Sequence, residues 1–162
     1  MGPMPREDRV RALLHSAETH TREGRFDRAV RAYRRILRLT DHGDFAREIA
    51  HARLGDLHIG MHEPQSAIAH LRRALSLSGG EPEYALMLGV ALLSAGRPQE
   101  AAESLYDALE SPTHLPDALA SLAEAAAALG DRAAAGRLAR RAASLDPVEP
   151  RFRLLVRDFA DA

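Results

Sequence analysis

Apolar residues recur along most of the chain at the spacing of amphipathic helices. In residues 82–94 they include Tyr84, Met87, Leu88 and Ala91, which follow the i, i+3, i+4 and i+7 pattern of one helical face. Similar patterns return in the neighbouring segments, and short polar stretches separate them. The chain is therefore predicted to consist of consecutive short helices.

Glycine, proline and aspartate mark the ends of these predicted helices. Three glycines fall where a left-handed residue can close the last helical turn: Gly24, Gly96 and Gly130. Pro64 and Pro98 fall at helix starts, where a missing backbone N–H costs no hydrogen bond. Asp131 is placed to cap the helix that follows it.

The helices are organised in a repeat of two helices each. Ala67, Ala101 and Ala135 are spaced by 34 residues, and twelve positions before each lies a small residue that follows a leucine. These small residues are Gly55, Gly89 and Ala123. We expect them to let the two helices of a hairpin approach closely. An earlier copy is centred on Ala29, 38 residues before Ala67, so four extra residues fall in the Thr40–Asp44 segment.

This frame resembles that of the tetratricopeptide repeat family, a 34-residue helix–turn–helix unit. The third unit carries the pattern at Leu88, Gly89, Leu92, Gly96, Ala101, Leu105 and Ala108. The fourth unit carries it at Leu122, Ala123, Gly130, Ala135, Ala142 and Pro147. The resemblance implies an all-α, right-handed superhelical solenoid. Its four repeats are expected at about 10–43, 48–81, 82–115 and 116–149, after an N-terminal extension at 1–9.

The chain departs from the family pattern at its bulky positions. The tryptophan position holds Leu13, His51, Ala85 and Leu119, and the tyrosine position holds His20, His58, Leu92 and Ala126. These losses remove bulk from the core. They predict a modestly stable solenoid, most of all in the alanine-rich fourth unit.

The last segment, residues 150–162, is predicted to be a C-terminal capping helix. Phe152, Leu155, Val156 and Phe159 form one stripe, and opposite it lie Arg151, Arg153, Arg157 and Asp158. An amphipathic helix with a polar outer face closes the open end of a helical stack. The alternative is a tail that docks on a partner.

Composition and charge exclude several kinds of chemistry. The chain has no cysteine, which excludes disulfides and cysteine-ligated metals, and its basic residues are all arginine, as expected of a GC-rich bacterial genome. Residues 1–47 hold eleven arginines and seven acids, whereas residues 81–131 hold one arginine and nine acids. Four arginines share a helical face, as a solvated surface or as a strip for an acidic partner or nucleic acid: Arg28, Arg31, Arg35 and Arg38.

No enzyme signature is present, and we expect no cofactor. The chain contains no phosphate-binding loop, nucleophile elbow or metalloprotease motif. His58 and His62 are four residues apart on a predicted helix, with His51 earlier, which is a spacing that can present two imidazoles to zinc. Because His58 takes the position of a core tyrosine, a packed ring is the preferred interpretation. No metal site is expected.

The resemblance also implies where a partner binds. The concave surface is lined by the second, fifth, ninth and twelfth positions of each unit, which in the first unit are Arg11, Leu14, Glu18 and Thr21. In the later units these positions give an apolar strip with an acidic rim. The predicted partner-binding residues are Asp56, Ile59, Glu83, Leu86, Val90, Leu93, Asp117 and Glu124. The alternative is that Leu86 or Leu93 packs against a neighbouring hairpin.

The resulting prediction is a non-enzymatic interaction module that binds a basic, apolar-anchored peptide or helix. Family members that clamp acidic chaperone tails use lysines and asparagines, which this chain lacks. Alternatives are a structural subunit of a larger bacterial assembly or a self-associating repeat protein, and, less favoured, a protein that binds a metal or small ligand among its histidines. We expect no nucleic-acid partner, since net charge is −1. The longest apolar run has ten residues, too few for a membrane span, so a cytoplasmic location is predicted.

Overall fold

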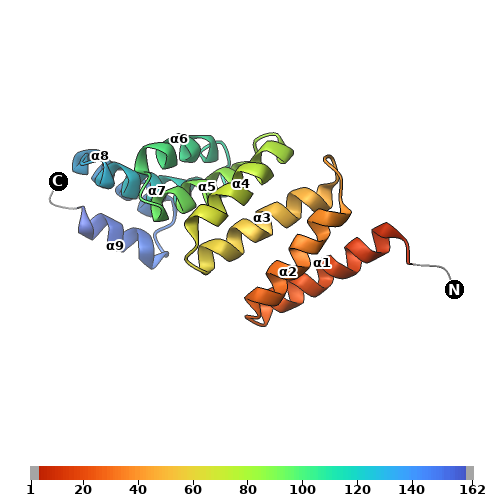
Figure 1. The fold of residues 1–162 in the computed structure, drawn as a ribbon. Coiled ribbons are helices and arrows are strands. Elements are labelled where there is room, and N and C mark those ends of the chain that lie inside the picture. Colours follow the sequence, from red (N-terminus) through yellow and green to blue (C-terminus); the bar gives the residue numbers. More distant parts are fainter. Residues whose placement is uncertain (1–3, 160–162) are drawn as a thin grey trace. The chain divides into compact units, whose positions relative to one another are not determined.

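The computed structural model describes residues 4–159, and in this range every regular element is an α-helix (Figure 1). The predicted all-α fold class is therefore confirmed. The chain divides into two compact units at Gly79 and Gly80. The first unit contains α1 (Arg6–Arg22), α2 (Phe26–Leu39), α3 (Phe45–Gly60) and α4 (Pro64–Ser78). The second contains α5 (Pro82–Ser94), α6 (Pro98–Ala108), α7 (Leu115–Ala128), α8 (Arg132–Leu145) and α9 (Pro150–Asp158).

Within each unit the helices pair as hairpins. In the first unit α1 packs on α2 and α3 packs on α4. The two hairpins contact each other mainly through α2 and α3. In the second unit α5 packs on α6 and α7 on α8, while α7 also contacts α5 and α6 (Figure 1). Helix α9 packs mainly on α8 and touches α7. Residues 1–3 of the predicted extension and 160–162 of the predicted capping helix lie outside the described range.

The turns inside the hairpins share one backbone geometry. Gly24, Gly96 and Gly130 have φ of 70°, 70° and 89°, which confirms that they end the first helices in the left-handed region. After α5, the Gly96 N–H donates to the Leu93 carbonyl at 2.9 Å and the Arg97 N–H to the Leu92 carbonyl at 2.9 Å. This pair of bonds is a Schellman motif, and it satisfies carbonyls that the helix end leaves free.

The predicted starts of the second helices are also confirmed. Pro64 is the first residue of α4 and Pro98 the first of α6. The Asp131 carboxylate accepts a hydrogen bond from the Ala134 N–H at 2.8 Å and caps α8.

The glycines of the repeat frame lie where two helices of one hairpin meet. A Cβ built on Gly55 would lie 2.5 Å from Cγ of Leu71 on α4. Gly89 on α5 stands in the same relation to Leu105 on α6. Both leucines are fully buried, so the absence of a side chain at each glycine lets the hairpin close around a leucine.

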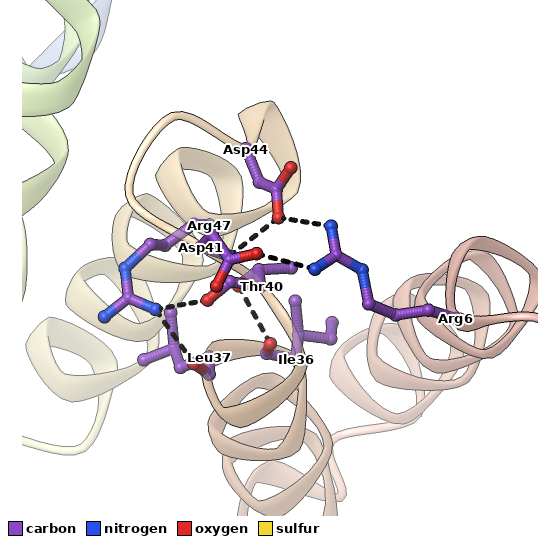
Figure 2. A network of polar contacts seen from close by, with 7 residues as sticks. All are labelled: Arg6, Ile36, Leu37, Thr40, Asp41, Asp44 and Arg47. Atoms are coloured by element: carbon purple, nitrogen blue, oxygen red, sulfur yellow. Dashed lines mark hydrogen bonds and ion pairs between the residues drawn. The ribbon is translucent and has the colours of Figure 1, made fainter.

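The connection between α2 and α3 is held by side chains (Figure 2). The Arg47 guanidinium donates to the carbonyls of Leu37 at 2.9 Å and Thr40 at 2.8 Å, at the carboxyl end of α2. On the other side, the Arg6 guanidinium of α1 contacts the carboxylates of Asp41 at 2.7 Å and Asp44 at 3.1 Å. The four extra residues of this connection are therefore fixed to three helices of the first unit.

Candidate partner-binding site

The first unit has an open cleft over α1, α2 and α3. Its volume is about 270 Å³, and its lining includes Glu18 and Thr21 from α1, Tyr33 from α2, and Arg53 and Asp56 from α3. Glu18, Thr21 and Asp56 occupy positions that the family resemblance assigns to the concave surface. The predicted site residue Asp56 is exposed here, and Ile59, one turn further along α3, is half-buried.

The second unit holds the apolar strip of the predicted site on α5. Leu86, Val90 and Leu93 are half-buried, and Glu83 in the first turn of α5 is exposed. The remaining two predicted residues, Asp117 and Glu124, lie on α7, which packs beside α5. Both are half-buried. The strip keeps part of its apolar surface open.

The acidic residues on α7 already have a cationic partner within the unit. The Arg151 guanidinium of α9 donates to the Glu124 carboxylate at 2.9 Å and to the Ser121 hydroxyl at 3.3 Å. It also lies 3.6 Å from the Asp117 carboxylate. The prediction that Arg151 lies on the polar outer face of the last helix is therefore wrong. Arg151 directly precedes the buried Phe152, so its Cα lies beside the α7–α9 contact and its long side chain extends to α7.

The arginines of α2 form an exposed basic face. Arg28, Arg31, Arg35 and Arg38 are all exposed, as the helical pattern predicted. A cleft of about 450 Å³ lies at the start of this helix, with Arg25, Arg28 and Arg31 in its lining. Asp27 lines the same cleft, so its charge is mixed.

Three histidines form a chain between α3 and α4. Nδ1 of His51 lies 3.0 Å from Nδ1 of His70, and the rings of His70 and His58 stack with centroids 5.6 Å apart. Nδ1 of His58 in turn lies 2.7 Å from the Glu63 carboxylate. His58 is buried, as its place at a core tyrosine position predicted. His70 was not predicted to take part, because its role depends on how α4 is oriented against α3.

The chain of rings shifts the titration of its members. Burial is the main cause that lowers the pKa of His51 to about 4, followed by the neighbouring His70, Arg47 and Arg73. Burial is also the main cause that lowers the pKa of His70 to about 4, followed by His58 and Arg34. Both imidazoles are therefore neutral at pH 7, which suits a ring-to-ring hydrogen bond.

The histidine spacing considered for zinc does not form a ligand set. Helix α3 ends at Gly60, so His62 lies beyond the helix, exposed, and not one turn above His58 on the same face. The expectation that both histidines lie on one helix is wrong. Over residues 4–159 no three histidine, aspartate or glutamate side chains are grouped to hold a metal ion. No helix in that range has the length and apolar content to cross a membrane.

Paired helices with a common turn and a small-residue contact define a helical-repeat protein. Sequence profiles of the tetratricopeptide repeat match residues 12–45 and residues 52–114. The chain belongs to the tetratricopeptide repeat family. A search of curated protein sequences found no match.

Several solved structures share this fold. MamA from Desulfovibrio magneticus is 16% identical with a TM-score of 0.85, and the match covers 95% of this chain and 85% of that one. PilF from Pseudomonas aeruginosa is 20% identical with a TM-score of 0.80, over 96% of this chain and 69% of that one. YrrB, described as a tetratricopeptide repeat protein with an unusual peptide-binding site, is 18% identical with a TM-score of 0.79, over 94% of this chain and 75% of that one. At these identities the likeness concerns the fold.

Proposed function

We propose that this protein is a non-enzymatic interaction module whose α5 and α7 surfaces bind a basic partner segment with apolar anchors. The observation that carries the proposal is the half-buried strip of Leu86, Val90 and Leu93, with Glu83 exposed at its start. Membership of a family whose members act as protein-interaction scaffolds supports it. YrrB, which has the same fold, is described as having a peptide-binding site.

The physical basis is a division of labour between apolar and acidic groups. Side chains that are only half-buried retain apolar surface, and covering it contributes roughly 25 cal/mol per Å². Carboxylates around such a strip raise the association rate of a basic partner more than they raise its final affinity. The binding is therefore expected to weaken as salt increases, without disappearing.

The test is partner capture from the source organism with paired variants. The double variant Leu86→Asp with Val90→Asp places two charges in the strip, and it is expected to lose the captured partner by at least about ten-fold in affinity. The control is Tyr106→Asp, on the exposed face of α6 in the same unit, which should retain the partner. Circular dichroism confirms that each variant is folded. Equal capture by wild type and the double variant contradicts the proposal.

Solution measurements separate this proposal from its alternatives. A monomer by light scattering, with capture sensitive to the strip, fits an interaction module for another protein. A stable homo-oligomer that the double variant leaves intact fits self-association through another surface. A bacterial source and a cytoplasmic location remain predictions from the sequence.

A further inference from the structure

Helix α7 carries a row of three side chains that together hold one guanidinium. Asp117, Ser121 and Glu124 stand at positions i, i+4 and i+7, so they share one helical face. Arg151 contacts all three, at 3.6 Å, 3.3 Å and 2.9 Å. Ser121 is fully buried, so its hydroxyl is fixed by the packing around it. The row is an arginine site that is filled by the chain's own arginine.

The contact next to this row is apolar and small. Phe152 is 2% exposed and packs in a cluster with Leu119, Ala120 and Ala142. Leu155, one turn along α9, is half-buried against the same cluster. An arginine, a phenylalanine directly after it, and a leucine three residues further on therefore make the attachment of α9 to this surface. On α8, the Arg132 guanidinium also donates to the Asp158 carbonyl at 3.2 Å.

The apolar burial of α9 is small. Phe152 is the single buried residue of α9, and Leu154 is 48% exposed. Arg151, Asp117 and Glu124 have half-exposed side chains, and ion pairs of this kind contribute about 0–1 kcal/mol each. A helix of nine residues is not stable in isolation, so α9 loses its helical structure when it leaves this surface.

We propose that the α7 row and the adjoining Phe152 contact form an interaction surface for a partner helix bearing Arg-Phe-x-x-Leu, and that α9 is its internal occupant. The inference rests on the proposed function, because Asp117 and Glu124 belong to the predicted binding site. It adds the chemistry of the partner and a competition. A partner binds only the fraction of molecules in which α9 has left, which lowers its apparent affinity by that fraction.

The probe is a labelled peptide with the sequence of residues 149–158, added to the full chain and followed by fluorescence anisotropy. In wild type, α9 competes with the peptide at the high effective concentration of a tethered group. Arg151→Ala weakens the internal contact and leaves the Phe152 cluster intact. The variant is expected to bind the peptide about five-fold more tightly than wild type.

Two controls localise the effect. Arg153→Ala, an exposed arginine of the same helix, should bind the peptide as wild type does. Adding Asp117→Asn and Glu124→Gln to Arg151→Ala should remove the gain. A peptide in which alanine replaces its first arginine should bind the Arg151→Ala chain more weakly than the unaltered peptide does. Thermal unfolding verifies that every variant is folded.

The outcomes distinguish this inference from the proposed function. Equal peptide affinity in wild type and Arg151→Ala, or a gain that persists after the acidic residues are neutralised, overturns the inference. Partner capture that depends on Leu86 and Val90 keeps the proposed function in that case. Conversely, a gain that follows the acidic residues supports the arginine site even where partner capture is insensitive to the strip.

Discussion

His62 occupies a position that glycine holds in the other three hairpins. It lies 34 residues before Gly96 and has a φ of 58°. Among the described residues it is the one non-glycine residue with a positive φ. Its N–H donates to the Ile59 carbonyl at 3.0 Å, and the Glu63 N–H donates to the His58 carbonyl at 2.8 Å. The turn is thus the same Schellman motif, built with a side chain that disfavours it.

We predict that His62→Gly stabilises the protein by about 0.5–1 kcal/mol. The change removes the steric cost of a left-handed residue, and the flexibility of glycine in the unfolded chain offsets part of the gain. Urea unfolding at pH 7 measures it. Gly96→Ala is the converse variant and should be destabilised by about 1 kcal/mol. A destabilised His62→Gly would contradict this account.

A second residue-scale prediction concerns the hairpin contact of Gly89. Gly89→Ala gains about 1 kcal/mol of helix propensity. Its Cβ meets Leu105, which is fully buried and has no open space to enter, and such overpacking costs about 1–3 kcal/mol. We expect net destabilisation in urea unfolding. Gly60→Ala is the control, because a Cβ there meets nothing within 4 Å, and it should be neutral or stabilising.

Residue-scale rules explain how much of these turns the sequence predicts. A glycine after an apolar helical face is a local signal, and Gly24, Gly96 and Gly130 were predicted from it correctly. His62 carries no such signal by itself. It becomes recognisable as a helix end only when the repeat frame is aligned on Gly96. Its distance of four residues from His58 led to the prediction that His62 lies on α3.

At the element scale, the histidine chain makes the α3–α4 hairpin sensitive to acid. His51 and His70 have pKa values of about 4 in the folded protein, below the usual 6.5. Because the folded values are depressed, the unfolded chain takes up protons between pH 6.5 and 4 that the folded chain does not. The contribution of these two neutral imidazoles to the unfolding free energy is therefore fully present above pH 6.5, and it is lost as pH falls toward 4.

We predict a loss of about 2 kcal/mol in unfolding free energy between pH 7 and pH 5, discounted for the half-exposed His70. Urea unfolding at the two pH values measures it. The variant His51→Gln with His70→Gln should lose most of this dependence, whatever its stability at pH 7. His42→Gln, an exposed histidine in the α2–α3 connection, should keep it. An unchanged pH dependence in the double variant would contradict the assignment.

Element contacts were less predictable than element positions. The 34-residue period located the hairpins because each unit repeats the same local pattern. The pairing of His51 with His70, and of Arg151 with Asp117 and Glu124, depends on the rotation of one helix against another. Helical spacing within a single segment does not contain that information. For this reason the acidic residues were predicted as a free rim, although a guanidinium holds two of them.

Large buried side chains are distributed unevenly among the hairpins. The buried residues of α4 include Ile68 and Leu71. Those of α8, a helix of similar length, are Ala135, Gly136, Ala139 and Ala142. Apolar burial scales with area, so α8 is held by less hydrophobic free energy than α4. The lower stability of the fourth unit, which its alanines indicate, stays a prediction.

We predict that amide protons in α8 exchange at least about ten-fold faster than those in α4 under native conditions. Hydrogen–deuterium exchange with mass spectrometry resolves the two helices. Ile68→Ala removes buried apolar surface from α4, so it should raise the amide exchange rate of α4 toward that of α8. Equal protection in wild type would contradict the prediction.

The connection between α2 and α3 is a suitable place for an insertion. Arg47 of α3 donates to the carbonyls of Leu37 and Thr40 at the end of α2, so a side chain joins the two helices directly, in addition to the chain that connects them. Asp41, His42 and Gly43 are exposed at the crest of the bend. A fluorophore-bearing or affinity-tag insert between His42 and Gly43 would thus extend into solvent, which makes this bend the natural attachment point for reporters in binding assays.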